Sequence, residues 1–130
     1  MEMKLELVQV PVSDVDRSLA FYTEQLGFVL DVDVRPMEGM RVVQLTPPGS
    51  ACSIGFGTGL PVHGGTPGSV RGLHLVVADI AAARAELAGR GVDVGEVTDA
   101  GGGVLCAGLQ DPDGNSLVLQ QMPWRTGDTF

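Results

Sequence analysis

His74 is the residue best suited to acid–base chemistry, because it is one of only two histidines and lies in the apolar stretch Leu73–Val77. An imidazole titrates near neutral pH, so His74 is a candidate catalytic residue that could act as a general base or bind an acidic or carbonyl group. A hydrogen-bonded core histidine would show the same pattern, and both interpretations stay open. The other histidine, His63, lies in a glycine-rich stretch and is expected to be a solvated loop residue.

Other catalytic motifs do not support a second active group. The sequence has no Gly-x-Ser-x-Gly motif, and its Gly55-x-Gly57-x-Gly59 run lacks the βαβ context of a dinucleotide site. Cys52 and Cys106 lie far apart, without the spacing of a metal site or a redox pair, so reduced thiols are expected.

The elements that must position these side chains occur twice in the chain. The stretches Leu7–Val15 and Gly72–Ile80 are both apolar and both end in a small residue, an aspartate and a β-branched residue. Asp14 and Asp79, half a chain length apart, stand where a helix N-cap is expected. The similarity therefore predicts an internal repeat of a strand followed by a helix.

Each copy continues with three further strands. Apolar residues at helical spacing predict helices over Val15–Leu26 and Ile80–Arg90, which end at Gly27 and Gly91. Period-two patterns and short apolar runs then predict strands over Phe28–Val34, Arg41–Leu45 and Cys52–Phe56, and over Val92–Val97, Gly103–Gln110 and Ser116–Gln121.

The predicted fold class is α+β, with two βαβββ modules in a single domain. Module one covers about residues 4–57 and module two about residues 71–121. A linker rich in Gly, Thr and Pro joins them over about residues 58–70, and a C-terminal tail covers residues 122–130.

On these features the chain resembles the vicinal-oxygen-chelate superfamily, of the glyoxalase, bleomycin-resistance and extradiol dioxygenase type. The resemblance covers nearly the whole chain and is carried by Val12–Tyr22, by Leu26–Phe28, and by the Asp-Pro-Asp-Gly-Asn turn at Asp111–Asn115. It implies that the sheets curl into a cup with the helices outside and the ligand site inside. It also implies a homodimer, because a second copy often completes or braces such cups.

Members of this superfamily that perform metal chemistry place four His, Gln or Glu ligands inside the cup. The matching positions here hold Leu7, Gly72 and Val118, and the fourth falls on Ser53 or Gly55. Leu, Gly and Val have no side-chain lone pair, and one serine cannot supply the several N or O donors that a divalent cation needs. We therefore expect no metal site and no cofactor.

The remaining polar and thiol side chains of the cup form the candidate ligand-binding set. Gln9 and His74 occupy equivalent positions in the two modules, and strand alternation places them on the faces of Leu7 and Gly72. Trp124 could stack on a flat or cationic ligand, or it could cover apolar surface at a module or dimer seam. A register slip of one residue would turn any strand residue to the opposite face. The candidates are Gln9, Gln44, Ser53, His74, Cys106, Gln110 and Trp124.

Charge and hydropathy restrict the partners. The net charge of −8, from 16 acidic residues against 8 Lys and Arg, disfavours nucleic acid and favours a cationic ligand. No apolar run is long enough to cross a bilayer, and Met1–Lys4 does not resemble a secretory signal. We therefore expect a cytoplasmic protein with neither a nucleic-acid partner nor a membrane partner.

The resemblance and the empty ligand positions together predict a metal-independent binding protein for a small cationic or aromatic organic molecule. Antibiotic sequestration or self-resistance is the corresponding biological role. The alternative is a metal-free lyase, isomerase or hydrolase that uses His74 as its acid or base. A third reading is a degenerate partner subunit whose cup is filled by side chains.

Overall fold

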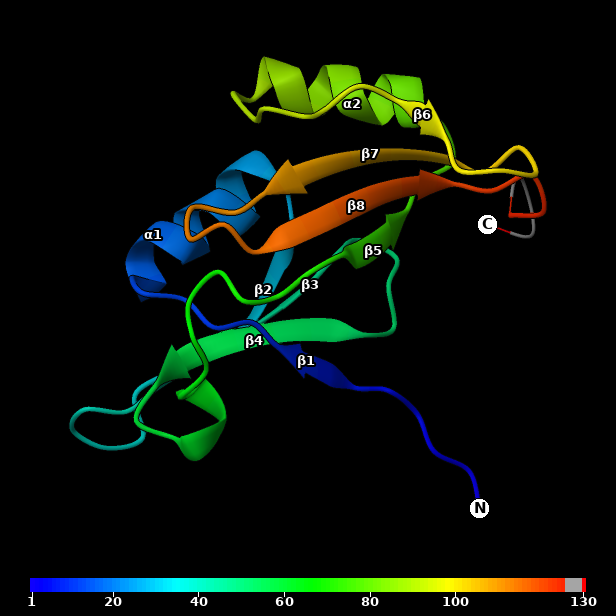
Figure 1. The fold of residues 1–130 in the computed structure, drawn as a ribbon. Helices are drawn as coiled ribbons and strands as arrows, with labels where there is room; N and C mark the ends of the chain where they lie inside the picture. The colour runs from blue at the N-terminus through cyan, green and yellow to red at the C-terminus, as the bar shows by residue number, and fades with distance from the viewer. Residues whose placement is uncertain (126–129) are drawn as a thin grey trace.

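Two four-stranded sheets carry the fold, which we describe from a computed structural model of residues 1–125 and 130 (Figure 1). The first half contains β1 (Leu7–Gln9), α1 (Val15–Ala20), the π-helix η1 (Phe21–Gln25), β2 (Val29–Val34), β3 (Arg41–Thr46) and β4 (Ser53–Thr58). After the 3-10 helix η2 (Pro61–His63), the second half contains β5 (Leu73–Val76), α2 (Ile80–Gly89), β6 (Thr98–Asp99), β7 (Leu105–Gln110) and β8 (Ser116–Gln121).

The two sheets have the same topology. Sheet A has the strand order β1-β4-β3-β2 and sheet B the order β5-β8-β7-β6. In each sheet the first strand runs parallel to its neighbour and the other pairings are antiparallel. The predicted α+β fold with two βαβββ modules is therefore confirmed.

Local sequence signals set the helix ends as predicted. The carboxylate of Asp14 accepts a hydrogen bond from the Arg17 backbone N–H at 3.1 Å, and that of Asp79 accepts one from Ala82 at 3.0 Å. Gly27 and Gly91 adopt φ angles of 78° and 83°, a left-handed conformation that glycine enters without a Cβ clash.

The first helix differs from the prediction in its second half. The Leu26 N–H bonds the Phe21 carbonyl five residues back, so the helix widens into a π-turn instead of continuing as an α-helix to Leu26. Phe21 and Tyr22 are adjacent and both buried, at 7% and 0% exposure, which a narrow apolar stripe on a regular α-helix would not allow.

The strand predicted over Val92–Val97 is wrong, because the strand of this region, β6, begins only at Thr98, although the Gly95 N–H still donates to the Gly108 carbonyl of β7 at 2.8 Å. Arg84 of α2 donates hydrogen bonds to the carbonyls of Val94 and Gly95, at 3.3 and 2.8 Å. A side chain of the helix thus satisfies these carbonyls, while Val92 and Val94 keep their apolar side chains in the core.

The turn between β7 and β8 connects the two modules beside α1 (Figure 1). Buried Asp111 accepts a hydrogen bond from the Tyr22 hydroxyl at 2.9 Å, and Asn115 donates one to the Pro11 carbonyl at 2.8 Å. Burial, together with the Asp111 carboxylate, raises the pKa of Tyr22 and keeps the hydroxyl protonated as the donor. None of the helices in the described part of the chain has the length and apolar character of a membrane span.

Candidate functional site

Sheet A has one face covered by the core and one open face. Val43, Leu45, Ile54 and Phe56 point toward the helical side and are at most 7% exposed. Residues that alternate with them form the opposite face, on which Gln9, Gly55 and Gln44 stand directly beside one another across β1, β4 and β3. We call this surface the open face of sheet A. It brings together the predicted residues Gln9, Gln44 and Ser53.

Gln9 is the most unusual residue of the open face. Its Oε1 is buried and has no hydrogen-bond partner among the described residues. A buried acceptor without a partner carries a desolvation cost of about 1–3 kcal/mol, which a donor arriving from outside the chain would remove. Gly55, beside Gln9, contributes no side chain, and the Leu7 side chain lies over it: a Cβ on Gly55 would be 3.0 Å from Leu7 Cδ1.

Two hydroxyl groups and a carboxylate are linked by hydrogen bonds at the end of the open face next to Gln44. The Thr46 hydroxyl donates to the Asp31 carboxylate and lies 2.6 Å from the Ser53 hydroxyl. Asp31 and Thr46 were missed in the sequence. Asp31 alternates with Val29, which pairs with Thr46, whereas the register shift between Leu30 and Val32 turns Asp33 to the other face.

His63, expected to be a solvated loop residue, ends the 3-10 helix η2. It is half-buried, and its imidazole occupies the space where a Cβ on Gly57 would lie 2.8 Å from Cε1 and 2.9 Å from Nε2. The Leu60 backbone N–H donates to Nδ1 at 3.3 Å, so the neutral ring carries its proton on Nε2. Glycine is required at residue 57 first by the backbone, since a Cβ there would lie 2.0 Å from the Arg41 carbonyl oxygen, and the His63 ring packs on the same bare position.

The candidates of module two share the corresponding face of sheet B. His74 pairs with Val118 and Val118 with Gly108, while Cys106 and Gln110 lie on the same face of β7. His74 and the β7 residues are two strands apart, about 10 Å. Gln120, beside Cys106, faces the same way and was missed although it alternates with Val118.

His74 has a defined tautomer when neutral. Its Nδ1 lies 2.6 Å from the Gly72 carbonyl, which can only accept, so Nδ1 carries the proton and Nε2 keeps its lone pair. The side chain is exposed and could therefore accept a proton or a hydrogen bond from a ligand.

The candidate residues of module two line different cavities. His74 lines a groove of about 580 Å³ between α2 and the turn at residues 47–50, and Gln110 lines a cleft of about 630 Å³ that also contains Val118. Neither cavity is lined by Gln9, Gln44 or Ser53. Trp124 follows β8 and is 62% exposed.

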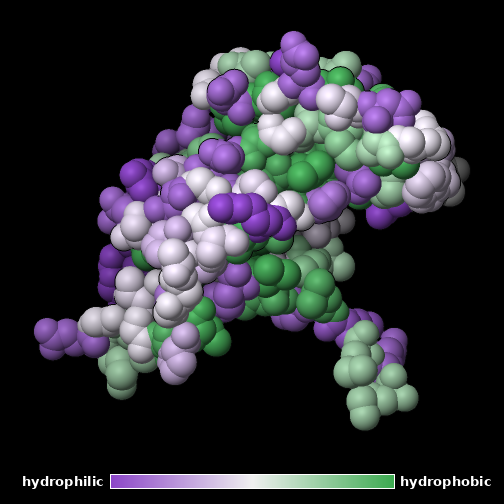
Figure 2. All heavy atoms as spheres, viewed as in Figure 1, coloured by the Kyte–Doolittle hydropathy of each residue, from purple (hydrophilic) through white to green (hydrophobic). Residues whose placement is uncertain are grey.

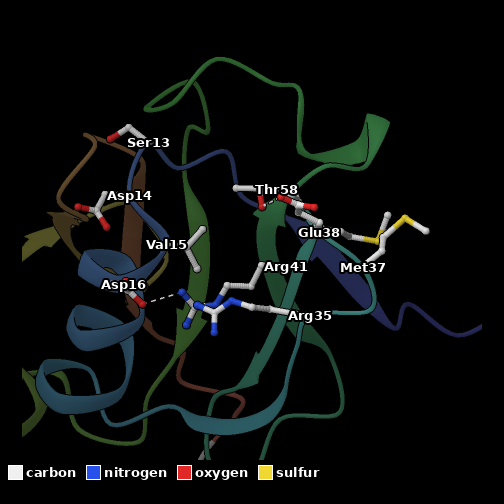
Figure 3. A pocket seen from close by; sticks show the side chains of 11 residues that line it. Ser13, Asp14, Val15, Asp16, Arg35, Met37, Glu38, Arg41 and Thr58 are labelled. Atoms are coloured by element: carbon white, nitrogen blue, oxygen red, sulfur yellow. Dashed lines mark hydrogen bonds and ion pairs between the residues drawn. The ribbon is translucent and has the colours of Figure 1, made fainter.

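A larger cavity, of about 740 Å³, lies between α1 and the β2–β3 connection (Figure 3). Its Arg41 guanidinium donates to Asp16 at 2.6 Å and to Asp33 at 3.0 and 2.9 Å. Hydrogen bonds to these two carboxylates raise the pKa of Arg41, so its charge is kept and already compensated within the chain. We therefore assign this arginine to structure.

The Asp33–Arg41 pair predicts an acid-sensitive contribution to stability. The hydrogen bond from Arg41 lowers the pKa of Asp33, so the pair stabilises the fold fully above the unfolded value near pH 4 and is lost as the pH falls through the folded pKa. In the Asp33→Asn variant, urea unfolding should show a flatter decline of stability below about pH 4, and a loss of at most about 1 kcal/mol at neutral pH. An acid decline as steep as that of the native chain would contradict this role.

These residues cannot coordinate the metal ion that metal-dependent members of the vicinal-oxygen-chelate superfamily bind. Leu7 and Val118 present only carbon atoms to the open faces, and the Ser53 hydroxyl is engaged with Thr46. Within residues 1–125 and 130, no three His, Cys, Asp or Glu side chains form a group that could hold a metal ion. The chemistry of the site therefore comes from hydrogen-bonding side chains and backbone.

The family model and the similar solved structures identify the same superfamily. The family model described as Glyoxalase/Bleomycin resistance protein/Dioxygenase superfamily matches residues 4–119. No curated protein matches the chain.

Solved structures extend the likeness. TnmS3, an antibiotic binding protein from Streptomyces sp. CB03234, is 36% identical with a TM-score of 0.78, over 92% of this chain and 96% of that chain. A superfamily member from Sphaerobacter thermophilus DSM 20745 is 30% identical with a TM-score of 0.79, over 93% of this chain and 98% of that chain. The chain belongs to the glyoxalase/bleomycin resistance protein/dioxygenase superfamily.

Proposed function

We propose that this protein binds a small cationic or aromatic organic molecule without a metal, and that it sequesters an antibiotic in the cytoplasm. The observation that carries the proposal is the Gln9 carboxamide on the open face of sheet A, whose buried Oε1 has no hydrogen-bond partner within the described part of the chain. A net charge of −8 favours a cationic ligand. The likeness to an antibiotic binding protein at 36% identity supports the same class of ligand.

We further propose that a second copy completes the site. Leu7 and Val42 on sheet A, and Val76 and Val118 on sheet B, remain half-buried on the faces opposite the buried core residues of their sheets. Figure 2 shows the surface hollowed beside the projecting N-terminal residues, with hydrophobic side chains on the inner wall. A homodimer would cover such faces and enclose a ligand. Sedimentation should give a dimer at micromolar concentration, and a clean monomer would count against this arrangement.

Isothermal titration calorimetry with a panel of cationic glycopeptide antibiotics and planar aromatic drugs tests the binding function. At least one compound should bind stoichiometrically, with the same affinity in the presence of a chelator. Binding of a cationic compound should weaken as salt is added, because screening reduces its attraction to the acidic protein. Absence of heat across the whole panel, or binding only after a divalent metal is added, would contradict the proposal.

A further inference from the structure

We propose that Asp31, Thr46 and Ser53 form a subsite that accepts hydrogen bonds, so that the ligand presents a protonated amine or a hydroxyl at this end of the open face. This inference rests on the proposed function and specifies the chemistry of its ligand.

The direction of the hydrogen bonds in this chain is fixed. The Thr46 hydroxyl has one proton, and it donates that proton to a carboxylate oxygen of Asp31. The contact of 2.6 Å between Thr46 and Ser53 must then use the proton of Ser53. Both hydroxyl protons are consumed inside the chain, so the three residues offer a ligand only acceptor atoms.

The backbone of β2 places Asp31 in this position. In the sequence Asp31-Val32-Asp33, strand alternation would put both aspartates on the same face. A bulge between Leu30 and Val32 separates them: Asp33 bonds Arg41 on the helical side, while Asp31 bonds Thr46 on the open face. Bulges re-aim side chains in this way and are frequent beside functional sites.

Two further side chains of the open face add one hydrogen-bond acceptor near Ser53 and one donor near Gly57. The unpartnered Oε1 of Gln9 lies on the same face, one side-chain row from Ser53. At the other end, the Nε2–H of neutral His63 lies over Gly57, four residues along β4 from Ser53, or about 13 Å. A ligand that spans the face would therefore carry a donor at the Ser53 end and an acceptor, such as a carbonyl oxygen, at the Gly57 end.

Matched naphthalene probes test this polarity. In ¹⁵N NMR titrations of the full chain, 2-naphthylmethylamine should bind about tenfold or more tightly than 2-naphthoate, and it should shift the amide signals of Gln44 and Ser53. The Asp31→Asn variant should lose this preference. Asp93→Asn, which removes one charge from an exposed residue of module two, should keep it.

Thr46→Val provides a second variant in case Asp31→Asn unfolds the protein. It deletes the hydroxyl that holds the Asp31 carboxylate, and the preference for the amine should fall severalfold. Equal affinity for the two probes, binding of neither at millimolar concentration, or an unchanged preference in a folded Asp31 or Thr46 variant would overturn the subsite. The antibiotic panel tests the binding function independently of these probes. If a drug binds without metal but the folded variants keep the native preference for the amine, the subsite is wrong and the proposed binding function still stands.

Discussion

Replacing Asn115 by alanine should lower the free energy of unfolding by about 3–4 kcal/mol, because three hydrogen bonds of this buried side chain are lost at once. The Asn115 amide donates to the Pro11 carbonyl and to the Asp111 carboxylate, both at 2.8 Å. Its carbonyl accepts from the Val70 N–H at 3.1 Å. The side chain thus fastens module one, the segment between the modules and the β7–β8 turn to one another. Urea unfolding monitored by circular dichroism measures the loss.

Gln110→Ala is the matched control, since Gln110 lies a few residues away at the exposed end of β7. That substitution should change stability by less than about 0.5 kcal/mol. If Asn115→Ala destabilised the protein no more than the control, the turn would not be the connection between the modules that its contacts indicate.

Replacing Gln9 by leucine should weaken ligand binding by about 10- to 100-fold while leaving stability unchanged or slightly raised. The reason is the buried Oε1, which has no partner in the described chain and costs free energy until a ligand donates to it. Leucine has a similar volume and removes that cost, but it leaves the donor of the ligand unpaired. Calorimetry with the antibiotic that binds most tightly in the panel, together with urea unfolding, measures both effects.

Gln25→Leu is the control on the helical side of the same module. Gln25 donates to the Arg90 carbonyl at 3.2 Å, so its loss should reduce stability slightly and leave binding unchanged. Native affinity in Gln9→Leu would show that the carboxamide takes no part in the site.

The sequence is sufficient for features whose cause is local. Asp14 and Asp79 cap helices because a short carboxylate followed by an apolar helical pattern satisfies the first free N–H groups wherever it occurs. Alternation within one strand is also local, but the shared face of Gln9, Gln44 and Ser53 depends on the register between β1, β3 and β4.

Tertiary structure decides the features that depend on distant partners. The register shift that turns Asp33 away from the face of Asp31 exists only in the pairing of β2 with β3, and the His63 ring packs on Gly57, a residue six positions earlier in the chain. Arg84 replaces a predicted strand by bonding two carbonyls ten and eleven residues away. Sequence alone therefore determined the two modules and their helix caps, while the register between strands decided which residues share a face. The arrangement of hydrogen-bond acceptors and donors along the open face comes from contacts between residues distant in the sequence. Such contacts produce no periodic pattern that could be recognised in the sequence.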